Sequence, residues 1–112
     1  MRAEAQTHVD QIRSALDLIR RFLDWDRAVR RLDELNQRVE DPNLWNDAKQ
    51  AQDVMRERRR LDEAIGAANA IQKELDDTIE LMEMAEAEGD ESLVDDAVAS
   101  LGDLAKRAER DK

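Results

Sequence analysis

The chain has 112 residues and a net charge of -10; 41% of its residues are charged and only 3% are aromatic. It has no cysteine, which excludes disulfides and thiolate metal sites. No apolar run approaches the roughly 18 residues that span a bilayer, and the first residues lack the apolar core of a secretory signal. We therefore expect a cytoplasmic protein with a single domain over residues 1–112.

Residues 4–22 are predicted to form the first helix, because apolar residues recur there at steps of three and four. This first stripe consists of Val9, Ile12, Leu16, Ile19 and Leu23. A second helical stripe follows and consists of Trp25, Val29 (or Ala28), Leu32, Leu35 and Val39. Asp24 or Asp26 is expected to cap the second helix by accepting a backbone N–H hydrogen bond. The sequence leaves open whether the two helices are separate or form one kinked rod.

Asp41-Pro42 interrupts the helical pattern, because proline disfavours the helical conformation of the residue before it. The second helix should therefore end just before this dipeptide, and a tight connector should follow. Asp41 can cap a short turn that has Pro42 at its first position. Asn46 or Asp47 can cap the next helix, and Gln50 lies three residues beyond Asp47, as in a capping box.

A long third helix is predicted over residues 47–88, and it would measure roughly 60 Å at 1.5 Å per residue. Its stripe has steps close to a heptad repeat, which favours coiled-coil-like packing. The stripe consists of Val54, Arg58, Leu61, Ile65, Ala68, Ile71, Leu75, Ile79, Met82 and Ala85.

Gly89 suits the left-handed position just past a helix end, and Asp90 can then cap a fourth helix. The residues of the fourth helix expected to face inward are Val94, Ala97, Leu101, Leu104 (or Ala105) and Ala108. A turn this short folds the fourth helix back antiparallel on the second half of the third. The predicted fold is all-α: an elongated antiparallel helical bundle, or coiled-coil-like hairpin, of three to four helices with one long central helix.

Trp25 and Trp45 are the only tryptophans. One stands at a predicted helix start and the other in the connector. We expect both rings to be buried where three helices meet, because a large aromatic side chain there removes more apolar area from water than an aliphatic one.

No motif predicts catalysis. The chain has no cysteine and a single histidine, His8, for which no partner is implied. Glu80, Glu83, Glu86 and Asp90 have a spacing that suits a metal site in a helical bundle, but no histidine accompanies them, and we interpret them as a solvated face. Isolated glycines exclude a phosphate-binding loop. We expect a protein that is not an enzyme, with no catalytic residue, metal, cofactor or small-molecule substrate.

Charge divides the chain into two unlike parts. Residues 1–60 carry 13 Lys and Arg against 12 Asp and Glu, whereas residues 61–112 carry 5 against 16. Acidic residues are repelled by phosphates, so any nucleic-acid contact should come from the first part. The candidate RNA contacts are Arg56, Arg59 and Arg60, supported by Arg27, Arg30 and Arg31. The alternative is a solvated helix face whose arginines pair with Asp53, Glu57 and Asp62. The candidate protein contacts are Glu86, Glu88, Asp90 and Glu91.

Several segments together resemble the start of the bacterial type 2 peptide chain release factors, within the class I family. They are Leu23-Asp24-Trp25-Asp26, Arg31-Leu32-Asp33-Glu34-Leu35-Asn36, Glu40-Asp41-Pro42-Asn43-Leu44-Trp45-Asn46-Asp47, Ala51-Gln52, Arg56-Glu57-Arg58, Arg60-Leu61 and Ala85-Glu86-Ala87-Glu88-Gly89-Asp90-Glu91. The stretch from Asp41 to Asp47 is the most specific, and the resemblance covers essentially the whole chain.

The resemblance implies a role at the ribosome. The family enters the ribosome at a stop codon and triggers hydrolysis of peptidyl-tRNA, and the type 2 factors read UGA and UAA. The family's Ser-Pro-Phe reading motif and Gly-Gly-Gln hydrolysis motif are absent here. We therefore expect an N-terminal docking and orienting domain, a fragment of a longer factor.

The implied partners are rRNA and ribosomal proteins of the stalk-base region, with no membrane partner. The alternative is a freestanding coiled-coil module for protein interaction or oligomerisation.

Overall fold

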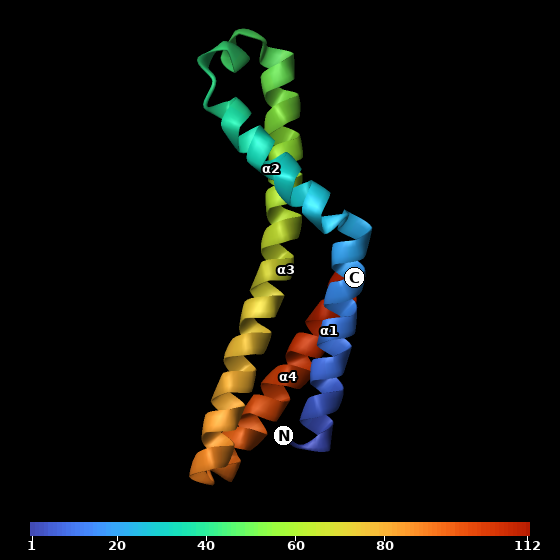
Figure 1. The fold of residues 1–112 in the computed structure, drawn as a ribbon, viewed down its shortest axis with the longest axis vertical. Helices are drawn as coiled ribbons and strands as arrows, with labels where there is room; N and C mark the ends of the chain where they lie inside the picture. Colours follow the sequence, from blue (N-terminus) through green and yellow to red (C-terminus); the bar gives the residue numbers. More distant parts are fainter. The chain divides into compact units, whose positions relative to one another are not determined.

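The computed structural model describes residues 1–112, and every regular element in it is helical (Figure 1). The elements in chain order are α1 (Ala3–Leu23), α2 (Trp25–Val39), the 3-10 helix η1 (Pro42–Asn46), α3 (Ala48–Glu88) and α4 (Glu91–Asp111). The predicted all-α class is confirmed, and so is the long helix, because α3 runs for 41 residues.

Asp24 separates α1 from α2, which settles the question that the sequence left open. Its φ of 55° is left-handed, a conformation that interrupts a right-handed helix. Asp24 precedes α2, but its side chain accepts no capping hydrogen bond, so the predicted capping role of Asp24 is wrong. The Ala28 N–H donates to the Asp24 carbonyl at 2.9 Å, and this is the first regular backbone hydrogen bond of α2.

The two connectors after α2 and α3 form as predicted. The Asp41 carboxylate accepts a hydrogen bond from the Asn43 N–H at 3.0 Å, and the Asp47 carboxylate accepts one from the Gln50 N–H at 3.1 Å. Gly89 has a φ of 70°, as the left-handed turn requires. The Asp90 carboxylate then accepts from the Leu93 N–H at 3.0 Å and caps α4.

Two compact units divide the chain. The bundle unit is Met1–Arg20 with Ala68–Lys112, and it combines most of α1, the second part of α3 and α4. The hairpin unit is Arg21–Ala67, and it contains α2, η1 and the first part of α3. The single domain expected over residues 1–112 stays a prediction.

The bundle unit buries apolar side chains from each of its three helices. Within it, α4 runs back along the second part of α3, and α1 lies beside α4 (Figure 1). The largest fully buried side chains of this unit are Val9, Ile12, Leu16, Ile71, Leu75, Met82 and Leu101. The predicted antiparallel hairpin of α3 and α4 is therefore confirmed.

The hairpin unit has a core of its own, between α2, η1 and the first part of α3. Its buried residues are Ala28, Leu35, Leu44, Ala51, Val54, Leu61 and Ile65, with Leu23, Trp25, Leu32 and Val39 packed against them. The sequence left open whether Ala28 or Val29 faces inward. Ala28 faces this core, since Val29 is exposed.

The predicted burial of Trp45 is wrong. Its side chain is 54% exposed, whereas its neighbour Leu44 is only 6% exposed and belongs to the hairpin core. A five-residue 3-10 helix turns only one side toward the core, and that position is taken by Leu44. Trp25 fits the expectation better, because it is partly buried against the same core.

Candidate nucleic-acid-binding surface

Arg56, Arg59 and Arg60 share one face of α3, since residues three and four apart are neighbours on a helix. All three side chains are exposed. Arg56 forms an ion pair with Asp53 at 3.7 Å, and no ion pair engages Arg59 or Arg60. The alternative of a solvated, paired face therefore describes Arg56, whereas Arg59 and Arg60 keep their charges available for a partner.

Arg58 interrupts the apolar stripe of α3 because it serves the packing of the hairpin unit. Its Nε donates a hydrogen bond to Oδ1 of Asn36 on α2 at 2.7 Å. The side chain is partly buried, and this hydrogen bond links α3 to α2. Because its Nε is directed at α2, Arg58 is not a candidate RNA contact, unlike Arg56, Arg59 and Arg60.

Arg31 and Glu57 join α2 to α3 through a two-pronged ion pair. The Arg31 Nε and Nη2 atoms donate to the two Glu57 oxygens, each at 2.8 Å. Arg31 Nη1 also donates to Glu34 at 3.3 Å. These bonds lower the pKa of the Glu57 carboxyl, an effect to which the nearby charges of Arg60 and Arg38 add. The Glu57 bonds, with that to Glu34, raise the pKa of the Arg31 guanidinium.

Arg31→Gln should lower the free energy of unfolding, by an amount that depends on pH. The Arg31 and Glu57 side chains are 39% and 32% exposed, so solvent screens the pair and we expect a loss of about 0.2–1 kcal/mol at neutral pH. The lowered Glu57 pKa means that this stabilisation is present above the ordinary carboxyl pKa of 4.5 and is lost as the pH falls through the lowered value.

Urea melts at neutral pH and at about pH 3 measure this difference. The matched control is Arg30→Gln, which removes an exposed arginine of the same helix that has no ion-pair partner. A gap between wild type and Arg31→Gln that stayed equally large in acid would contradict the assigned cause.

The acidic residues predicted to contact protein surround the turn between α3 and α4 in the bundle unit. Glu86, Glu88, Asp90 and Glu91 are all exposed. Glu86 lies 3.4 Å from the Met1 amino group, and Asp90 is engaged as the cap of α4. The role of these residues as protein contacts stays a prediction.

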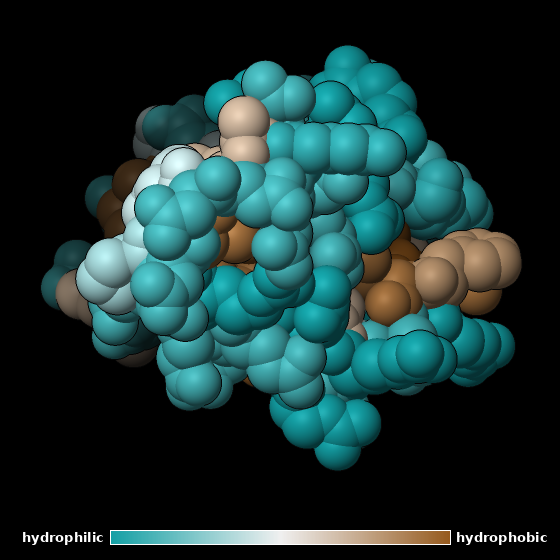
Figure 2. Space-filling model, turned by 90° about the horizontal axis from the view of Figure 1, so that it is seen from above, coloured by the Kyte–Doolittle hydropathy of each residue, from teal (hydrophilic) through white to brown (hydrophobic).

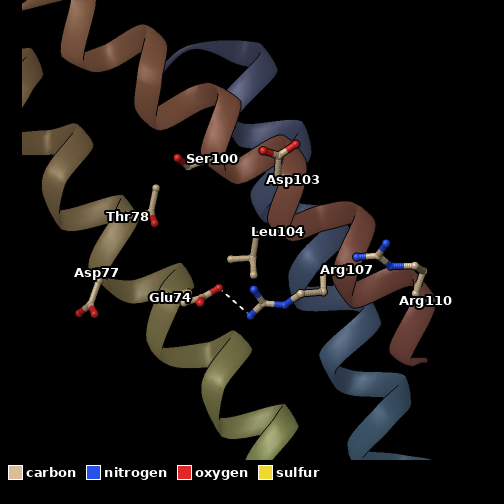
Figure 3. Close-up of a pocket in the computed structure, with 8 residues that line it drawn as sticks. All are labelled: Glu74, Asp77, Thr78, Ser100, Asp103, Leu104, Arg107 and Arg110. Carbon is tan, nitrogen blue, oxygen red and sulfur yellow. Dashed lines mark ion pairs between the residues drawn. The ribbon is translucent and has the colours of Figure 1, made fainter.

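A groove between α3 and α4 was not anticipated from the sequence (Figure 3). Arg107 of α4 pairs with Glu74 of α3 at 2.6 Å, and Thr78 and Ser100 lie on the two facing helices. No histidine lines this groove, so neither hydroxyl has an imidazole beside it to take its proton. The Glu74–Arg107 pair spans 33 positions, and only the fold brings it together.

The surface is largely hydrophilic. Figure 2 shows hydrophilic side chains over most of the visible face, with hydrophobic groups in the gaps and in a few protrusions. None of the helices combines the length and the apolar character of a membrane span. No three His, Cys, Asp or Glu side chains are grouped so as to hold a metal ion.

Comparison with known proteins shows the family of the chain. The model of the PCRF domain matches residues 28–111, a range that includes the arginine face of α3 and the acidic turn. Relatives called peptide chain release factor 2 include those of Paramagnetospirillum magneticum, 48% identical over 96% of this chain and 29% of the relative, and of Ruegeria, 44% identical over the same shares.

A third relative with this name, from Caulobacter, is 51% identical over 78% of the chain and 24% of its own length. The chain thus spans less than a third of the relatives it matches. The resemblance to type 2 release factors is confirmed, and the chain belongs to the PCRF domain family.

Proposed function

We propose that the chain is the N-terminal docking and orienting domain of a type 2 translation termination factor. The whole factor would act in the cytoplasm and would recognise the stop codons UGA and UAA. The observation that carries the proposal is the match of 96% of the chain to relatives called peptide chain release factor 2. These relatives are more than three times as long. We propose that stop-codon reading and peptidyl-tRNA hydrolysis belong to other parts of such a factor, since the match covers only 29% of the relative.

The proposed partner is the ribosome, at the rRNA and ribosomal proteins of the stalk-base region. The exposed, unpaired Arg59 and Arg60, with Arg56 beside them, support an rRNA contact in the hairpin unit, because guanidinium groups bind phosphate oxygens through paired hydrogen bonds. The exposed carboxylates near Gly89 support a protein contact in the bundle unit. The family match favours this role over a freestanding coiled-coil module.

The chain is also proposed to be non-catalytic and to use no cofactor or small-molecule substrate. The physical support is the lack of the paired groups that activate a nucleophile. His8 lies 4.0 Å from Glu4, and no serine, threonine or lysine is hydrogen-bonded to it. Without such a partner, the imidazole has no nucleophile beside it that it could activate by taking its proton.

Ribosomes stalled at a stop codon test both the docking proposal and the non-catalytic proposal. We expect the 112-residue chain to sediment with them and to release no peptide above background. An intact type 2 factor is the positive control for release. A chain that stays in the supernatant would contradict docking, and stop-codon-dependent release by the chain alone would contradict its non-catalytic role.

A further inference from the structure

A pocket lined only by charged side chains lies on the hairpin unit. Arg27, Arg30 and Arg31 share one face of α2 with Glu34, and Glu57 of α3 completes the lining. The pocket is open to solvent and has a volume of about 520 Å³. Three guanidinium groups and two carboxylates therefore meet in one place.

The two carboxylates are already engaged. Both Glu57 oxygens accept hydrogen bonds from Arg31 at 2.8 Å, and Glu34 accepts one from the same guanidinium at 3.3 Å. Arg27 and Arg30 are exposed and have neither an ion pair nor a hydrogen bond. The pocket thus presents two guanidinium groups without an anionic partner. The Arg31–Glu57 pair links α2, the helix that carries them, to α3.

We propose that this pocket binds the phosphodiester backbone of RNA, with Arg27 and Arg30 donating to phosphate oxygens. Arg31 is a positioning residue, because its donors are directed at Glu57 and Glu34. A guanidinium offers a planar fork that matches two phosphate oxygens, which makes arginine suited to such contacts. The choice of RNA as the nucleic acid rests on the proposed function; the phosphate chemistry rests on the pocket itself.

The composition of the pocket favours nucleic acid over an acidic protein. Protein interfaces are usually anchored by buried aromatic or aliphatic side chains at their centre. Every residue lining this pocket is charged. Interfaces with nucleic acid are more polar and more positively charged, and their affinity comes largely from phosphate contacts.

The test compares two double variants of the full chain. Arg27→Gln with Arg30→Gln removes both unpartnered guanidinium groups from the pocket. Arg13→Gln with Lys106→Gln removes two exposed, unpaired charges from the bundle unit and gives the same net charge. The probe is a fluorescein-labelled RNA hairpin, titrated by fluorescence anisotropy over a series of KCl concentrations. Circular dichroism establishes that both variants keep the helix content of the wild type.

We expect the pocket variant to bind the hairpin about tenfold or more weakly at low salt. The slope of log affinity against log salt should also decrease by about one unit for each phosphate group that the variant no longer binds. The Arg13 and Lys106 variant should bind as the wild type does. Equal losses in the two variants would overturn the proposal, because general charge would then explain binding. Failure of the wild type to bind the hairpin would overturn it as well.

A polyglutamate peptide as a second probe distinguishes the ligand classes. Binding of this peptide with the same affinity and the same dependence on Arg27 and Arg30 would overturn an RNA site in favour of an acidic protein. Failure of this inference can also be distinguished from failure of the ribosome-docking proposal. A pocket variant that sediments with ribosomes unchanged and binds the hairpin normally removes this inference alone. Loss of sedimentation in a wild type that still binds the hairpin removes the docking proposal alone.

Discussion

Leu35→Ala should lower the free energy of unfolding by about 2–5 kcal/mol, because Leu35 is fully buried in the core of the hairpin unit. Truncation removes apolar burial and leaves a cavity that neighbours such as Leu61 fill only in part. A small domain has a total stability of about 5–15 kcal/mol, so the change should shift a urea melt strongly.

Trp45→Ala is the matched control for this prediction. It removes a larger side chain from the same unit, yet Trp45 is more than half exposed, so we expect a loss below about 1 kcal/mol. Urea melts followed by circular dichroism compare both variants with the wild type. A cost for Trp45→Ala equal to that of Leu35→Ala would contradict the exposed position of the ring.

Reversal of Arg56, Arg59 and Arg60 to Glu should weaken ribosome binding by about a hundredfold or more at low salt. Three attractive charges become three repulsive ones on one helix face, and the salt slope should fall by about one unit for each phosphate group that the face no longer binds. Sedimentation of the chain with ribosomes at several salt concentrations measures both quantities.

The control reverses three exposed, unpaired charges of the bundle unit to Glu, at Arg13, Lys106 and Arg110. This variant has the same net charge as the first and should keep much more of its affinity. Binding that fell equally in the two variants would show that net charge, rather than the arginine face of α3, governs docking. Unchanged binding in the first would leave that face as a solvated surface.

Local signals explain why the helix ends could be predicted from the sequence. The Asp41-Pro42 and Gly89-Asp90 pairs act through backbone conformation and nearby hydrogen bonds, which depend on adjacent residues alone. The orientation of Trp45 depends instead on which side of η1 meets the core. That choice is made by packing with α2 and α3 and leaves no periodic pattern in five residues.

The candidate site was only partly predictable for a similar reason. The exposed face of Arg56, Arg59 and Arg60 follows from helical spacing. The Arg31–Glu57 pair joins residues 26 positions apart, and the pocket beside Arg27 and Arg30 exists only once α2 packs on α3. The continuous stripe of α3 also hid the division into two units, since one helix supplies both cores.

Competition with an intact factor tests the docking role most directly. Peptide release by a full-length type 2 release factor is measured on ribosomes halted at UGA, with increasing amounts of the 112-residue chain. If the chain occupies the docking site, release should slow as the chain is added, and the Arg56, Arg59 and Arg60 reversal variant should compete poorly. Release that stays at the same rate when the chain is in large excess over ribosomes and factor would contradict the docking role.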